Sequence, residues 1–204
     1  DHPVSVLDYS SLYPSCMIAE NLSHDSIVLD EEYMGEDGGK LLKELGFDYV
    51  DVEYDNHKYI KKGQAFQKVI NELEPKKVCR YVQFPNNEKG IIPKILMNLL
   101  GERKKTRKKI EYKTITTKNC DTYNGLLSEK DNITTILQEN GEKIEIKKED
   151  ITEVNDTYTD FQKAVLDGLQ LAFKVTANSL YGSIGASTSQ IYRKEIAAST
   201  TAVG

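Results

Sequence analysis

The sequence is poor in cysteine and has no long apolar run. Its 204 residues include three cysteines, Cys16, Cys79 and Cys120, which lie far apart. Cysteines without a paired spacing argue for a reducing compartment and against a disulfide framework or a zinc site. No stretch is long and apolar enough to span a membrane, and the first residues show no signal-peptide pattern. We therefore expect no membrane partner.

Over the whole chain, acidic residues outnumber basic ones, with 32 Asp and Glu against 27 Lys and Arg. This average does not indicate a nucleic-acid binder. Six of the seven residues from Arg103 to Lys109 are nevertheless Lys or Arg. Such a local basic stripe is a more relevant electrostatic signal than the net charge of the chain.

The chain begins with a short apolar run and a turn. Residues 4–8 are β-branched and apolar and fit a buried strand that ends at Asp8. Tyr13-Pro14 then favours a turn or the first turn of a helix, because proline lacks an N–H donor and fixes φ. Since the sequence starts without methionine and stops at Gly204, directly after a helix-compatible run over 194–201, we expect it to be a piece of a larger protein.

The next segment is less regular. Residues 30–55 are acidic and contain glycines, which predicts a surface excursion. The alternation over 80–84 predicts a strand. Residues 85–90 have the composition of a turn and lead into a long helix predicted over 92–112.

This helix combines apolar and cationic residues. At about 100° per residue, one side holds an apolar stripe that two arginines continue: Ile92, Leu96, Leu99, Leu100, Arg103, Arg107 and Ile110. The lysines of the basic run lie largely elsewhere and are interpreted as a solvated face: Lys104, Lys105, Lys108 and Lys109. An arginine on an apolar stripe is costly unless an anion meets it, so a phosphate is favoured for Arg103 and Arg107.

Residues 114–159 differ in composition from the rest of the chain and are interpreted as an insertion between two helices. They are rich in Thr, Asn, Asp, Glu and Lys. Within them, residues 133–139 and 142–148 are predicted to form a β-hairpin, because Asn140-Gly141 is the preferred pair of a type I′ turn.

A second long helix is predicted over 159–182. One face carries a polar stripe: Lys163, Asp167, Gln170, Lys174, Asn178 and Tyr181. The opposite face is more apolar: Phe161, Val165, Leu169, Ala172 and Thr176. Lys174, Asn178 and Tyr181 follow a spacing of i, i+4 and i+7 and point the same way. Gly182 and Gly185 are expected to loosen the chain after this helix.

The chemistry of these two regions is ambiguous when each is taken alone. Asp8 suits Mg²⁺, but an aspartate that caps the following helix is the commoner arrangement. The N–H groups near Ser11 form a natural anion site, and Tyr13 is either a core residue or a ring that lies against a bound sugar. The face with Lys174 is either a plain polar surface or a phosphate-binding surface. A carboxylate for metal together with cations for phosphate is the arrangement expected for phosphoryl transfer.

Three segments resemble family B DNA polymerases. Residues 8–15, Asp-Tyr-Ser-Ser-Leu-Tyr-Pro-Ser, are similar to motif A, and residues 174–182, Lys-Val-Thr-Ala-Asn-Ser-Leu-Tyr-Gly, are similar to motif B. Residues 90–96, continuing to Arg103, resemble the first helix of the fingers. The three segments occur in the order of the family.

For motif A, the resemblance implies a metal and sugar site. Asp8 would be a catalytic carboxylate that holds a pair of Mg²⁺ ions, with the backbone carbonyl of Tyr9 as a further ligand. Ser11 and Leu12 would offer N–H groups to the triphosphate. Tyr13 would be the steric gate that excludes a ribose 2′-hydroxyl.

For the fingers, the resemblance implies a triphosphate site. Arg103 and Lys174 would neutralise the phosphates, with Asn178 beside them. Arg107 stands where the family usually has lysine, so charge is kept while geometry changes. Tyr181 would lie near the nascent base pair and sense the shape of its minor groove.

Two features separate this sequence from the complete cellular enzymes. The insertion over 114–159 is expected to be absent from cellular replicative polymerases, and together with residues 181–188 it is similar to polymerases of giant algal and amoebal DNA viruses. The second catalytic carboxylate of the family lies in a Y-G-D-T-D-S motif, which this sequence does not contain. We therefore expect the 204-residue chain alone to incorporate no nucleotide.

The sequence thus predicts an α+β fold with part of a polymerase palm, an antiparallel sheet with helices, and α-helical fingers carrying a β-hairpin insertion. Palm is expected over 1–89, fingers over 90–184 and a return to the palm over 185–204. The parent would be a delta-like replicative DNA polymerase that acts at a viral replication site in the infected cell. Its partners would be primer–template DNA, deoxynucleoside triphosphates and, through other segments, a sliding clamp. The alternatives are a catalytically inactive nucleic-acid- or nucleotide-binding module with the polymerase fold, and a nucleotide-binding domain of another family.

Overall fold

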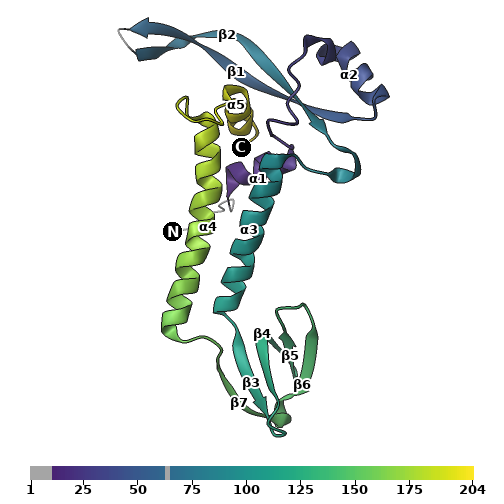
Figure 1. Cartoon of the computed structure of the whole chain (residues 1–204), viewed down its shortest axis with the longest axis vertical. Helices are drawn as coiled ribbons and strands as arrows, with labels where there is room; N and C mark the ends of the chain where they lie inside the picture. Colours follow the sequence, from purple (N-terminus) through teal and green to yellow (C-terminus); the bar gives the residue numbers. More distant parts are fainter. Residues whose placement is uncertain (1–10, 63–64) are drawn as a thin grey trace, which may run out of the picture. The chain divides into compact units, whose positions relative to one another are not determined.

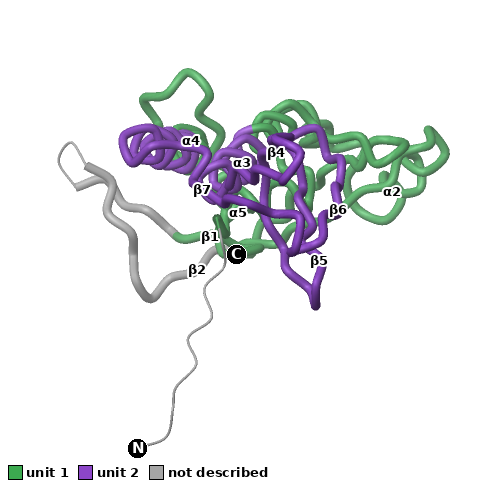
Figure 2. The backbone as a smooth tube through the Cα atoms, turned by 90° about the horizontal axis from the view of Figure 1, so that it is seen from below, with its two compact units in different colours: residues 1–98, 177–204 green, residues 99–176 purple. Residues whose placement is uncertain are grey.

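The computed structural model describes residues 11–62 and 65–204, with side chains described outside 58–74. Over these residues the fold is mixed α and β, with five α-helices and two antiparallel sheets (Figure 1). The chain divides into two compact units, residues 1–98 with 177–204, and residues 99–176 (Figure 2). The boundary falls inside two long helices, α3 (Ile91–Ile110) and α4 (Asp160–Gly185).

The first unit is built on a long β-hairpin. Strand β1 (Asp48–Lys62) pairs antiparallel with β2 (Ala65–Gln83), from Asp48 opposite Gln83 to Lys62 opposite Ala65. Val52 and Tyr54 on β1 are buried, whereas the acidic residues between and beside them are exposed. This alternation follows from the period of two in a strand and gives the hairpin one face against the unit.

Three helices complete the first unit with the ends of α3 and α4. They are α1 (Leu12–Ala19), α2 (Gly35–Glu44) and α5 (Lys194–Val203), with short 3-10 turns at Glu31–Tyr33 and Pro85–Asn87. The fully buried side chains at the centre come from several of these segments: Met17, Leu22, Tyr81, Ile184 and Ile196.

The start of α3 is fixed by polar groups from the loop after α1. The Ser23 hydroxyl accepts a hydrogen bond from the N–H of Ile92 at 3.2 Å, and the Asp25 carboxylate accepts one from the N–H of Ile91 at 3.1 Å. These oxygens satisfy N–H groups that have no partner within the helix. Helix α3 therefore begins at a defined point in the first unit.

The second unit consists of the remaining parts of α3 and α4 and a five-stranded antiparallel sheet. The order of its strands is β6 (Lys143–Lys147), β5 (Ile133–Leu137), β4 (Thr122–Lys130), β3 (Lys113–Thr117) and β7 (Ile151–Asp156). Tyr112, Ile115 and Ile136 are buried in this unit.

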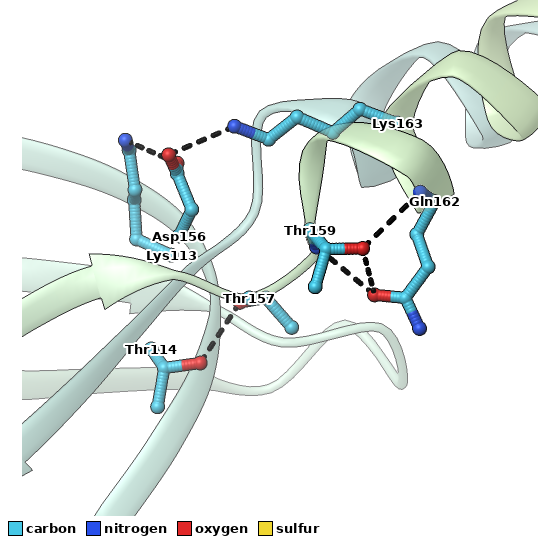
Figure 3. A network of polar contacts seen from close by, with 7 residues as sticks. All are labelled: Lys113, Thr114, Asp156, Thr157, Thr159, Gln162 and Lys163. Atoms are coloured by element: carbon cyan, nitrogen blue, oxygen red, sulfur yellow. Dashed lines mark hydrogen bonds and ion pairs between the residues drawn. The ribbon is translucent and has the colours of Figure 1, made fainter.

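A polar network ties the sheet to α4 (Figure 3). The Asp156 carboxylate at the end of β7 accepts from Lys113 at 2.5 Å and from Lys163 of α4 at 2.8 Å. At the start of α4, the Gln162 side chain accepts from the N–H of Thr159 at 2.9 Å, and the Thr159 hydroxyl accepts from the N–H of Gln162 at 3.3 Å. This reciprocal capping box fixes the first turn of α4.

The two predicted long helices are confirmed as α3 and α4, with bounds shifted by a few residues. The helix starting near Tyr13-Pro14 is α1, the strand predicted over 80–84 is the end of β2, and the run over 194–201 lies in α5. Helix α4 continues through Gly182 and ends at Gly185, so the prediction that these two glycines loosen the chain is wrong for Gly182, whereas the helix does end at Gly185. The strand predicted over 4–8 lies outside the described residues.

The structure adds regular elements to two of the predicted connecting segments. Residues 30–55, predicted as a surface excursion, contain α2 and the start of β1, and most of their side chains are exposed or partly exposed. The stretch predicted as an insertion with one hairpin forms the five-stranded sheet, and the hairpin is its β5–β6 pair.

The turn of that hairpin is not type I′. A type I′ turn needs positive φ at both central residues, but of Asn140 and Gly141 only Gly141 has one, 88°. The N–H of Gly141 donates to the carbonyl of Gln138 at 3.1 Å, and the N–H of Gln138 donates to the carbonyl of Glu142 at 2.9 Å. These bonds define a three-residue loop that ends in a left-handed glycine.

Candidate nucleotide-binding site

The first turn of α1 places a set of N–H groups beside Tyr13. Ser11 precedes the helix in the left-handed conformation, at φ 59° and ψ 57°, and its carbonyl accepts from the N–H of Ser15 at 3.0 Å. The first N–H groups of an α-helix have no partner within the helix. The Ser11 hydroxyl is buried and has no hydrogen-bond partner among the described residues. The turn over Ser11 and Leu12 thus has the donors that an anion requires.

The rings of Tyr13 and Tyr181 are stacked. Their centroids are 4.4 Å apart and their planes differ by 23°. Tyr13 is 37% exposed, so it is not a core residue, which was one of the two interpretations of its sequence context. Two predicted site residues that lie 168 positions apart in the sequence are thereby in direct contact within the first unit.

Thr201 of α5 holds the hydroxyl of Tyr181. The two hydroxyl oxygens are 2.9 Å apart, and the Thr201 hydroxyl is also 3.0 Å from the carbonyl oxygen of Ala197. A threonine hydroxyl has one hydrogen. Because the Ala197 carbonyl can only accept, Thr201 donates to it and accepts from Tyr181. Sequence reasoning assigned no role to Thr201, since it lies outside both motifs.

The remaining predicted residues of motif B lie along α4. Helix α4 runs unbroken from Lys174 through Asn178 to Tyr181, as the spacing predicts. Lys174 and Asn178 are exposed. Within the described part of the chain, Lys174 makes no hydrogen bond or ion pair. Its ammonium is therefore available for an anionic ligand.

Arg103 and Arg107 differ in their surroundings. Arg103 is half-buried and its Nε donates to the side-chain oxygen of Gln170 on α4 at 3.3 Å. Arg107 is exposed, so the prediction that it continues the apolar stripe is wrong. Thr106 is buried in its place, with its hydroxyl donating to the carbonyl of Glu102 at 2.8 Å. The buried side of α3 is not the same along its length: Leu96 is buried in the part that belongs to the first unit, and Thr106 in the part that belongs to the second.

A buried cluster anchors α5, the helix that carries Thr201. The Tyr81 hydroxyl donates to Ser199 at 2.9 Å, and neither residue has exposed surface. Burial raises the pKa of Tyr81, that of Cys79 and that of Tyr54, the last to about 12. These groups therefore remain protonated at neutral pH.

The predicted metal ligands, Asp8 and Tyr9, lie outside the described residues. Among the residues that the structure describes, no group of three or more His, Cys, Asp or Glu side chains is arranged to hold a metal ion. All three cysteines are free. None of the described helices has the length and apolarity to cross a membrane.

Comparison with known proteins places the chain in a family. The family model for DNA polymerase family B matches residues 1–127 and 128–204. The DNA polymerase of Pyramimonas orientalis virus is 52% identical over 202 residues, which cover 99% of this chain and 16% of that protein. The DNA polymerase of Phaeocystis pouchetii virus is 36% identical over 220 residues, covering 100% of this chain and 16% of that protein.

A cellular relative gives a similar result at lower identity. The DNA polymerase delta catalytic subunit of Oryza sativa subsp. japonica is 28% identical over 204 residues, which cover 100% of this chain and 12% of that protein. The chain spans about one sixth of the length of the viral relatives. Because the family model matches the chain from its first residue to its last, the chain belongs to DNA polymerase family B.

Proposed function

We propose that this chain is the part of a viral replicative DNA polymerase that binds the incoming deoxynucleotide. The contact between Tyr13 and Tyr181 is the observation that carries the proposal. It joins the part of motif A that lies in α1 to the part of motif B that lies in α4, and both rings belong to the predicted nucleotide site. We assign residues 1–89 and 185–204 to the palm and residues 90–184 to the fingers.

Under this proposal, each group of residues has its own role in binding the nucleotide. The turn at Ser11 and Leu12 offers N–H groups to the triphosphate, and Lys174 and Arg103 offer cations that neutralise it. The ring of Tyr13 lies under the sugar, where a 2′-hydroxyl would collide with it. Charge neutralisation and positioning are the main contributions that a protein makes to phosphoryl transfer.

Asp8, with the backbone carbonyl of Tyr9, would hold Mg²⁺ in this chain, since oxygen atoms are the ligands that this ion prefers. When bound, a pair of Mg²⁺ ions would stabilise the charge that develops as the primer 3′-hydroxyl displaces pyrophosphate. The partner carboxylate and any sliding-clamp contact would come from segments outside this chain. We propose that the activity serves DNA replication in an infected cell, a proposal supported by the similarity of the chain to the DNA polymerases of two viruses.

The test is the Tyr13→Ala variant of the complete polymerase that contains this chain. Relief of a steric clash is expected to raise ribonucleotide insertion relative to deoxynucleotide insertion by roughly ten- to a hundred-fold. Single-nucleotide insertion kinetics with matched ribo- and deoxynucleotides measure this ratio. Unchanged sugar discrimination would contradict the assignment of Tyr13, and an inactive wild-type polymerase would favour a binding module that has only kept the fold.

A further inference from the structure

The hydroxyl of Thr201 fixes the far end of the Tyr181 ring. It accepts from the Tyr181 hydroxyl at 2.9 Å while donating to the carbonyl of Ala197 at 3.0 Å. A tyrosine side chain rotates about two bonds only, so a hydrogen bond at its hydroxyl determines where the ring lies and how it is tilted. The position of the Tyr181 ring therefore depends on α5 as well as on α4.

The part of α5 that carries Thr201 is firmly held. Ile196, Ser199 and Thr200 are buried without exposed surface. Ser199 accepts from the buried Tyr81 of β2 at 2.9 Å, and the Thr200 hydroxyl donates to the Ile196 carbonyl at 2.7 Å. Close packing and satisfied buried hydrogen bonds leave this turn little freedom. Thr201 projects from this support to Tyr181.

The ring of Tyr181 in turn limits the ring of Tyr13. With centroids 4.4 Å apart and planes 23° from parallel, the two rings are in van der Waals contact over their faces. Tyr13 cannot tilt toward Tyr181 without displacing it. A gate that excludes a hydroxyl group by collision requires this kind of restraint, because a ring free to tilt would make room.

We propose that Thr201 is a positioning residue that determines sugar selectivity. Its hydroxyl holds Tyr181 against Tyr13, and the stacked pair keeps the space beside the sugar closed to a 2′-hydroxyl. The inference rests on the proposed function, since it needs Tyr13 to be the gate. It adds a residue from outside both motifs to the specificity of the site.

The test compares the ratio of deoxy- to ribonucleotide insertion efficiency in variants of the complete polymerase. Thr201→Val keeps the size and branching of the side chain and removes the hydroxyl, and we expect the ratio to fall about five-fold, the effect of one lost hydrogen bond. Tyr181→Phe removes the same bond from the other side and is expected to cause the same fall. The double variant is expected to fall no further than either single variant.

Two variants separate positioning from general damage. Thr201→Ser keeps the hydroxyl and is expected to restore discrimination to within about two-fold of the wild type. Thr188→Val makes the same chemical change at an exposed threonine in the loop before α5, and is expected to leave the ratio unchanged.

The outcomes distinguish this inference from the proposed function. If Thr201→Val and Tyr181→Phe keep wild-type discrimination while Tyr13→Ala loses it, the role of Thr201 is overturned and the gate stands. If Tyr13→Ala also keeps discrimination, the assignment of the gate itself fails. Should Thr201→Val not fold, Tyr181→Phe decides alone, since an unchanged ratio in that variant overturns the inference.

Discussion

The hydrogen bond between Tyr81 and Ser199 provides a sharp test of how the site is supported. Tyr81 lies on β2 and Ser199 on α5, two residues before Thr201. Both side chains are buried without exposed surface, and the two oxygens are 2.9 Å apart. Tyr81→Phe removes a single oxygen atom and leaves the ring in place, so the expected effect is local to α5.

The size of the effect follows from what each variant leaves behind. Tyr81→Phe removes the Tyr81 donor from the buried hydroxyl of Ser199, which then keeps, among the described residues, only its hydrogen bond with the Cys79 side chain, and the loss costs about 1–3 kcal/mol. Ser199→Ala leaves the Tyr81 hydroxyl with a long contact of 3.4 Å to the carbonyl of Glu195 and costs a similar amount. The double variant buries no unmatched hydroxyl at this place, so its cost is expected to be smaller than the sum of the two.

Hydrogen exchange measures this cost within the complete polymerase. A loss of about 1–3 kcal/mol in the free energy of opening speeds amide exchange in α5 roughly five- to 150-fold, whereas amides of the five-stranded sheet in the other unit are the internal control. Additive effects of the two single substitutions would refute the reasoning, because they would show that the hydroxyl groups do not act on each other. Unchanged exchange in Tyr81→Phe would refute it as well.

Two further predictions concern charged groups. Hydrogen bonds from Lys113 and Lys163 lower the pKa of Asp156 from 3.8 to about 2. The stability that this carboxylate contributes is therefore present above pH 3.8 and is lost as the pH falls toward 2. Carbon-detected NMR titration of Asp156 measures the midpoint, and a midpoint near 3.8 would contradict the network. Lys174→Ala is expected to raise the KM for deoxynucleotides roughly ten- to a hundred-fold through loss of a charge-assisted contact. Lys104, on α3, is also exposed, and Lys104→Ala is expected to leave this KM unchanged. Equal effects in steady-state kinetics would show that these lysines supply only general positive charge.

The sequence predicts which residues to assign to the proposed site, but not the contacts between them. The spacing along α4 was enough to place Asn178 and Tyr181 on one helix, and the stacking of Tyr181 on Tyr13 is consistent with their assignment to one site. The role of Thr201 could not be predicted, because nothing in the sequence distinguishes a threonine that hydrogen-bonds a distant tyrosine from any other threonine in a helix. The prediction for Arg107 was wrong because it assumed that the same side of α3 is buried along the whole helix.

Helix α2 was not predicted from the sequence. It contains Gly35, Gly38 and Gly39, and glycine is a poor helix former. The structure gives two of them a packing role, because a side chain at Gly38 would overlap the backbone of Tyr33 and one at Gly39 would overlap the ring of Tyr49. Close approach to neighbouring segments outweighs the entropic cost of glycine here.

The pairing of β3 with β7 has a consequence for how this family can vary. Lys113 stands opposite Asp156, and the N–H of Thr157 donates to the carbonyl of Tyr112 at 3.1 Å, so the chain enters and leaves the sheet at one place. Strands that are added or lost beyond this point do not change the distance between the residues that join α3 and α4. A segment with paired ends can therefore change length over evolution while the helices that carry the proposed triphosphate-binding cations keep their geometry.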